Sequence, residues 1–64
     1  MNPIKQLRKK AKLTQIEAAE RAGLPQGNWS QIERRETLDD TSAAILRRVA
    51  KALGVTVDKL IGEP

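Results

Sequence analysis

The chain has 64 residues, enough for one domain, and a domain of this size buries only about 60% of the surface that its unfolded chain exposes. It contains no Cys and no His, which excludes disulfides, zinc sites and the usual general base or thiolate nucleophile. Twelve Lys and Arg against eight Asp and Glu give a net charge of +4. That charge favours a polyanionic partner, with solubility alone as the alternative. We therefore expect a single domain over residues 1–64 that is not an enzyme and uses no metal or other cofactor.

No apolar run approaches the roughly 20 residues of a membrane span. The start of the chain, MNPIKQLRKK, lacks the long apolar stretch of a signal peptide. We expect a cytoplasmic protein with no membrane contact and no small-molecule substrate.

The first helix is predicted over residues 3–11. Asn2 followed by Pro3 is typical of an N-cap and a first helical position. Ile4 and Leu7 then recur at helical spacing, so one side of this helix is expected to face the core.

The second helix is predicted over residues 15–22. Thr14 and Glu17 form the T-x-x-E pattern of a capping box, in which each side chain binds the other residue's backbone N–H. Gly23 ends the helix, because a residue without a Cβ can take the left-handed conformation found at helix C-termini.

Three further helices are predicted, over residues 26–34, 42–53 and 57–61. Pro25 is tolerated in the first turn of the helix that follows it. Thr41 or Ser42 can cap the next helix, and Gly54 stands where that helix should end. The fold class is therefore all-α, with five short helices.

The second and third predicted helices, with the turn at Gly23 between them, have the order of a helix-turn-helix, whose second helix enters the major groove of DNA. In this interpretation the segment 26–35 enters the groove. A generic helical bundle, in which Gly23 only joins two antiparallel helices, is the alternative, since the apolar spacing fits both.

Six groups of residues carry a family resemblance: Leu13-Thr14-Gln15, Glu17 with Ala19, Ala22-Gly23-Leu24, WSQIE at 29–33, VAKALGV at 49–55, and Leu60. In combination they resemble the Xre/Cro family of phage-repressor-like DNA-binding domains. The resemblance covers about residues 4–61 and implies a compact five-helix, lambda-repressor-like domain with its helix-turn-helix at the second and third helices. It also implies a sequence-specific transcriptional regulator, a repressor, whose partner is double-stranded DNA.

Polar residues on the third predicted helix are the candidate base readers. Gln26, Asn28 and Gln31 carry amides, which pair bidentately with adenine. Ser30 lies on the same exposed side. Gly27 stands where the resembling family often has a long polar side chain, and here it would let the DNA approach the backbone.

Phosphate contacts are expected at both ends of the motif. Gln15, at the start of the second predicted helix, can offer its amide and nearby backbone N–H groups, and the resemblance implies a clamping role for it. Arg34 and Arg35 are placed to neutralise phosphates, although they also complement the end of a helix. Because Arg35 stands where the family commonly has Gly, we expect the helix to continue there before the chain turns.

The resemblance also implies that Arg8 pairs with Glu33 while facing the DNA backbone. Trp29 is expected in the core, because its position is apolar in the family and the small Ala18 leaves room for an indole. Stacking of this ring on bases is the alternative.

Four lysines mark the first predicted helix and the turn after it. They form either a second phosphate surface or a solvated helix face. We assign Lys5 and Lys10 to the solvated face and leave Lys9 and Lys12 open between the two.

Three acids, Glu36, Asp39 and Asp40, follow the third predicted helix and would repel the DNA backbone. Either this loop turns away from the duplex or DNA affinity is weak. Together with Gly27, the acids favour a rival function, a protein-interaction module of the same fold, like an antitoxin or coactivator, in which DNA is secondary.

Domains of this class bind palindromic sites as dimers, with half-sites about 34–36 Å apart. Apolar residues near the end of the chain exceed what a small core needs: Val55, Val57, Leu60 and Ile61. We expect a homodimer that uses this end.

Overall fold

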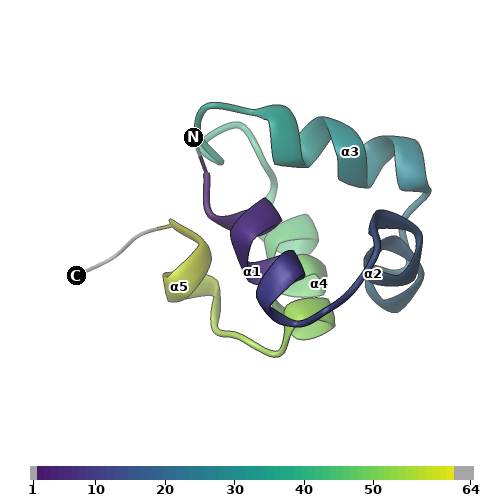
Figure 1. Ribbon diagram of the computed structural model, residues 1–64. Helices are drawn as coiled ribbons and strands as arrows, with labels where there is room; N and C mark the ends of the chain where they lie inside the picture. Colours follow the sequence, from purple (N-terminus) through teal and green to yellow (C-terminus); the bar gives the residue numbers. More distant parts are fainter. Residues whose placement is uncertain (1, 62–64) are drawn as a thin grey trace.

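Five helices make up the fold of the computed structural model, which describes residues 2–61 (Figure 1). They are α1 (Ile4–Lys10), α2 (Gln15–Ala22), α3 (Gln26–Arg34), α4 (Ala43–Leu53) and α5 (Val57–Ile61). Within residues 2–61 there is no strand, and no helix is long and apolar enough to cross a membrane. The predicted fold class is confirmed, and the predicted helix bounds agree with these to within one residue.

The ends of α2 and α4 follow the capping residues of the sequence. Thr14 Oγ1 accepts a hydrogen bond from the Glu17 N–H at 3.1 Å, and Glu17 Oε1 accepts one from the Thr14 N–H at 2.9 Å. This reciprocal pair is the predicted capping box. Of the two candidates for the α4 cap, Ser42 takes the role, with its Oγ 3.2 Å from the Ile45 N. Gly23 ends α2 in the left-handed region with a φ of 69°.

Asn2 was predicted as the N-cap of α1 and Pro3 as its first helical position, but the structure places both residues before the helix, with Pro3 as the N-cap. Asn2 Oδ1 accepts a hydrogen bond from the Ile4 N–H at 3.0 Å. Its Nδ2 donates to the backbone oxygens of Ile32 and Arg35 at 2.9 and 2.7 Å. Because Asn2 is buried, these bonds hold the start of α1 against the end of α3, where Figure 1 shows the two segments together.

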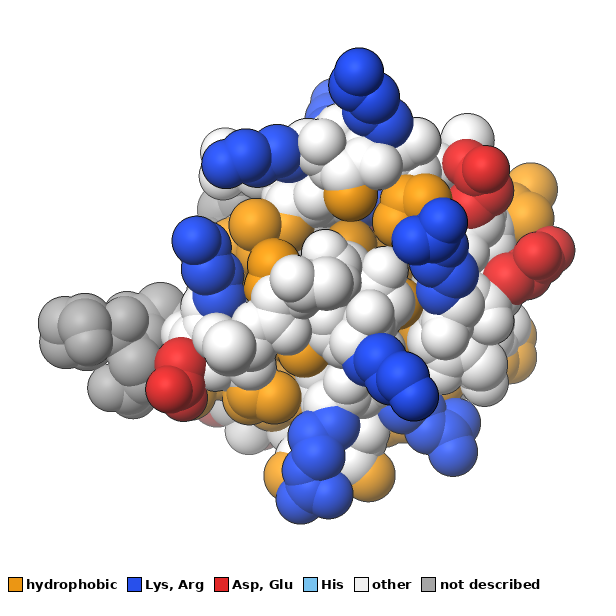
Figure 2. All heavy atoms as spheres, turned by 90° about the horizontal axis from the view of Figure 1, so that it is seen from below, with side chains coloured by type: hydrophobic (Ala, Val, Ile, Leu, Met, Phe, Trp, Pro, Cys, Tyr) orange, Lys and Arg blue, Asp and Glu red, His pale blue; other side chains and the backbone are white. Residues whose placement is uncertain are grey.

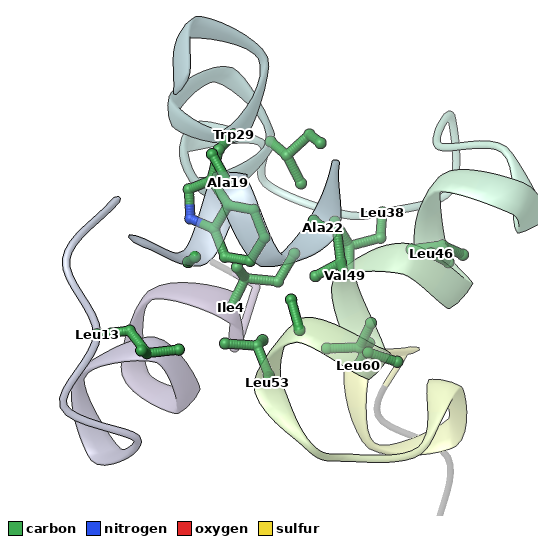
Figure 3. Close-up of a cluster of buried hydrophobic side chains, with 14 residues drawn as sticks. Ile4, Leu13, Ala19, Ala22, Trp29, Leu38, Leu46, Val49, Leu53 and Leu60 are labelled. Carbon is green, nitrogen blue, oxygen red and sulfur yellow. The ribbon is translucent and has the colours of Figure 1, made fainter. Parts of the chain in front are cut away.

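The core lies between the helices, with Trp29 among its fully buried side chains (Figure 3). α2 packs against both α3 and α4, and α4 also packs against α5. Ala18 and Ala19 are both buried on α2, so that helix offers small side chains where its neighbours approach. The large indole is completely buried in the same core cluster as these alanines, so the prediction that Trp29 lies in the core is confirmed.

The turn between α2 and α3 sets the direction of α3. Leu24 is half-buried against the core, and Pro25 has an extended backbone with a ψ of 147° and no side-chain capping bond. From this turn α3 runs across the top of the molecule in Figure 1, with one side on the core and the other facing outwards.

Lys12 has a φ of 61°, in the left-handed region, which the sequence did not predict. Among the described residues, no other residue except glycine has a positive φ. The tight turn between α1 and α2 places Lys12 in this region, with its N–H donating to the Lys9 oxygen at 3.0 Å. For an L-amino acid this conformation costs about 1–2 kcal/mol.

We predict that Lys12→Gly stabilises the protein, because glycine adopts this conformation without the Cβ clash. After the extra chain entropy of glycine in the unfolded state is subtracted, the gain in the free energy of unfolding should be about 1 kcal/mol. Urea denaturation followed by circular dichroism measures it. Lys9→Gly, inside α1, is the matched control and should destabilise. Equal destabilisation by both substitutions would contradict the prediction.

Candidate nucleic-acid interface

The outer side of α3 carries the predicted base readers. Gln26, Asn28 and Gln31 are exposed, and Ser30 is half-buried between them and the core. The buried side of the helix is made by Trp29, Ile32 and Glu33. The helix therefore presents three amide side chains outwards, which is the chemistry that pairs with base edges.

Gly27 lies in the first turn of α3 and is exposed. A Cβ added to it would meet nothing within 4 Å, and its φ is outside the left-handed region. Nothing in the fold therefore requires glycine here, although glycine in a helix costs about 1 kcal/mol relative to alanine.

Arg8 and Glu33 form the buried ion pair that the family resemblance implied, and this prediction is confirmed. Arg8 Nε lies 2.5 Å from Glu33 Oε2, and Nη2 lies 3.4 Å from Oε1. Arg8 Nη1 also donates to the Leu13 oxygen at 2.9 Å. The Arg8 side chain is only 11% exposed, so most of its donors are directed into the protein.

Two further side chains donate to the Glu33 carboxylate. Trp29 Nε1 lies 2.6 Å from Oε2, and Gln15 Nε2 lies 3.0 Å from Oε1. Burial by itself raises the pKa of Glu33, but the hydrogen bonds from Arg8, Gln15 and Trp29 and the Arg8 charge bring the pKa below its usual range. The carboxylate is therefore ionised and connects α1, α2 and α3. We call Glu33 and these three donors the Glu33 cluster.

Gln15 occupies the first turn of α2, where helix N–H groups lack partners within the helix and favour an anion. Its bond to Glu33 uses one of the two amide hydrogens. Gln15 also borders a hollow beside α3, together with Ser30, Arg34 and Lys5.

Lys5, which the sequence assigned to a solvated helix face, is exposed. It lies on the side of α1 that borders the hollow with Arg34 and Gln15. Lys5 precedes Arg8 by three residues, which places both on one side of a helix. That spacing, combined with the implied Arg8–Glu33 pair, was the signal that could have located it.

Arg35 corrects one expectation. Its backbone is extended, with a ψ of 141°, so α3 ends at Arg34 and does not continue through position 35. The Arg35 side chain donates from Nη1 to Thr41 Oγ1 at 2.9 Å. This bond, and the Asn2 bond to the Arg35 oxygen, hold the chain in its turn away from the helix.

The acidic loop after α3 is anchored by Leu38, which is buried in the core. Its acids lie in different places. Asp40 borders a hollow with Asn28 and Gln31, next to the outer side of α3. Asp39 borders another hollow, with Leu60 and Asn2, on the side of α5. Glu36 borders the hollow of Gln15, Ser30 and Arg34. Two acids of the loop, Asp40 and Glu36, therefore lie near predicted DNA-binding residues.

Positive charge is not confined to the side of α3. Figure 2 shows the molecule from below, so that α3 lies on the far side, and several Lys and Arg side chains surround this face with few acids among them. Charge alone therefore does not locate a DNA-binding surface on this protein. The location depends on the polar side of α3 and on the hollow beside it. Within residues 2–61 no group of three or more acidic side chains could hold a metal ion.

A helix-turn-helix family model matches residues 4–60, so the chain belongs to the helix-turn-helix family of DNA-binding domains, in its Xre/Cro or lambda-repressor-like form. Over 60 residues it is 42% identical to the immunity repressor protein of Bacillus phage phi105. The match covers 94% of this chain and 40% of that protein, so the chain spans less than half of the relative's length. No solved structure matches the chain.

We predict that Glu33→Gln destabilises the protein by roughly 3–5 kcal/mol at pH 7, because it leaves the buried Arg8 guanidinium without its counter-charge. The pKa of Glu33 is lower in the folded protein than in the unfolded chain. The stability that the ionised Glu33 contributes is thus present in full above the unfolded pKa and is lost as the pH falls through the lower, folded pKa.

Denaturation curves of both proteins at pH 7 and at intervals down to pH 3 measure this. The difference in the free energy of unfolding between wild type and Glu33→Gln should shrink as the pH falls. Glu20→Gln, at an exposed site on α2, serves as the control for the loss of one charge. A difference that stays constant with pH, or one no larger than that of Glu20→Gln, would show that the pair does not hold the helices together.

Proposed function

We propose that this chain is the DNA-binding domain of a transcriptional repressor, which recognises a short operator by placing α3 in the major groove. The observation that carries the proposal is the set of three exposed amides on α3, a helix that the Glu33 cluster connects to α1 and α2. A helix held in this way can present the same donors and acceptors to each base pair.

Gln26, Asn28 and Gln31 are the proposed base readers, with Ser30 beside them. Gly27 is consistent with the same DNA-binding surface. The fold does not require glycine at this position, whereas the absence of a side chain would let a duplex approach the backbone of α3.

Phosphates are the proposed partners of Gln15, Arg34, Arg35 and Lys5. Gln15 acts from the start of α2, and Arg34 and Lys5 act from the two sides of the hollow. Arg8 contributes by holding Glu33, since its side chain is 11% exposed.

The relative from phage phi105 is named as an immunity repressor, which supports repression over activation for this chain. We propose that the chain acts in the cytoplasm, where operator DNA is accessible, and that it works by binding, without catalysis or a cofactor.

The proposal is tested by titrating labelled duplexes into the protein at two salt concentrations, with one mixed sequence and one sequence selected from random DNA. Binding should weaken as salt rises, because phosphate contacts release counterions. Gln31→Ala should lose about 1–3 kcal/mol on the selected sequence and little on the mixed one. Arg34→Ala should weaken both sequences alike. No binding at the lower salt concentration would reject DNA as the partner.

Lys5 and Lys10 provide a matched pair for the same assay. Both are exposed lysines of α1, but Lys10 borders a different hollow, with Leu53 and Lys59, away from α3. Lys5→Ala should reduce the slope of log affinity against log salt by about 1, and Lys10→Ala should leave it nearly unchanged. Equal effects would mean that only net charge matters.

The second candidate is a protein-interaction module of the same fold. Asp40 favours it, because this acid lies beside Asn28 and Gln31, where it would repel phosphate. Absence of salt-dependent duplex binding, together with a folded protein, would support this candidate.

We further propose that the chain binds a palindromic operator as a homodimer through the end that carries α5. Ile61 is 46% exposed there, and Val55 and Val57 are partly buried. The expectation that Leu60 forms part of an exposed apolar surface is wrong: its side chain is 1% exposed and belongs to the core.

Ile61→Ser should therefore reduce cooperative binding to a duplex with two half-sites, while affinity for a single half-site should be unchanged. Gel-shift titration on the two duplexes compares them. Unchanged cooperativity would rule out this end of the molecule, and the absence of any cooperativity in the wild type would rule out a dimer on DNA.

A further inference from the structure

Trp29 is a donor to Glu33 that has no place in the proposed DNA contacts. Its side chain is completely buried, and its indole N–H lies 2.6 Å from Glu33 Oε2, one helical turn further along α3. Core packing on every side fixes the ring, so the direction of this N–H is fixed as well. A buried N–H requires a partner, and here that partner is a charged carboxylate.

The donors divide between the two oxygens of Glu33. Oε2 receives the Trp29 indole and Arg8 Nε, both at short distances of 2.6 and 2.5 Å. Oε1 receives Gln15 Nε2 at 3.0 Å, while the second Arg8 bond to Oε1 is long, at 3.4 Å. The rigid side of the cluster is therefore at Oε2, and Gln15 is the closest partner of Oε1.

Gln15 needs this orientation for its proposed task. It is half-buried at the start of α2, and one amide hydrogen bound to Glu33 leaves the other hydrogen and the amide oxygen free to face the hollow beside α3. Rotation of the Glu33 carboxylate would release the Gln15 amide from this direction.

We propose that Trp29 is a positioning residue for DNA binding: its indole N–H fixes the Glu33 carboxylate so that Oε1 holds the Gln15 side chain in the direction of a DNA phosphate. This inference rests on the proposed function, since it concerns how the phosphate contact of Gln15 is prepared. It assigns the tryptophan a role that an apolar residue of equal size would not perform.

The direct test replaces the N–H without changing the size of the ring. The chain has 64 residues and one Trp, so chemical synthesis can place 3-benzothienylalanine at position 29, where sulfur substitutes for the N–H group. DNA affinity is measured for this analogue and for tryptophan, each with Gln15 and with Gln15→Ala, on the selected duplex. Thermal denaturation shows that each protein is folded at the assay temperature.

We expect the analogue to lose about threefold to tenfold in affinity when Gln15 is present, as for the loss of one hydrogen bond. With Gln15→Ala in place the analogue should change affinity by less than about twofold, the usual limit for independent sites. Val49→Ala, a core change on α4 at a fully buried residue, is the matched control for lost stability and should show no such dependence on Gln15.

Equal losses with and without Gln15, or no loss at all, would overturn the inference. If the tryptophan protein itself binds no duplex, it is the proposed function that fails. Trp29→Phe serves as a second variant if the analogue does not fold. The signal of the Gln15 side-chain amide in NMR spectra supplies an independent measurement: it should shift when the indole N–H is removed and should not shift with Val49→Ala.

Discussion

The buried carboxylate of Glu33 is the interaction on which the arrangement of the first three helices depends. A buried charge is costly unless it is paired and hydrogen-bonded, and here the required partners come from three different helices: Arg8 from α1, Gln15 from α2 and Trp29 from α3 itself. The relative placement of these helices brings the three donors within hydrogen-bond distance of the carboxylate. The same placement determines which side of α3 faces outwards.

Asn2 gives a second connection between α1 and α3 that does not depend on charge. Its amide nitrogen donates to backbone oxygens at the end of α3, and its Oδ1 accepts from the N–H of Ile4, the first residue of α1. Thus α3 is held near its end by Asn2 and along its buried side by the Glu33 cluster. In a 64-residue chain without disulfides, polar contacts of this kind supplement a small core in holding α3 in place.

Local rules predicted most of the fold. The capping box at Thr14 and the glycine at 23 located the ends of α2, since caps act through neighbours in the sequence. The burial of Trp29 was predicted from the family resemblance, in which this position is apolar.

The long-range hydrogen bonds were not predicted from local patterns. Nothing in the sequence around Asn2 reveals that its amide reaches residues 30 and 33 positions away. Only family resemblance identified the Arg8–Glu33 pair. The proposed site was thus predictable as a set of exposed polar positions on α3. The Gln15–Glu33 hydrogen bond and the place of Lys5 beside the same hollow depend on how α1, α2 and α3 are placed relative to one another.

The central claim is that the outer side of α3 and the first turn of α2 form one DNA-binding surface. The most direct measurement is an NMR titration of the ¹⁵N-labelled protein with a duplex that carries a single half-site. Our account predicts that the largest shifts occur at the exposed residues of α3 and at Gln15 and Ile16, with little change in α5. Shifts concentrated on α5 or on the face opposite α3, with α3 unaffected, would contradict it.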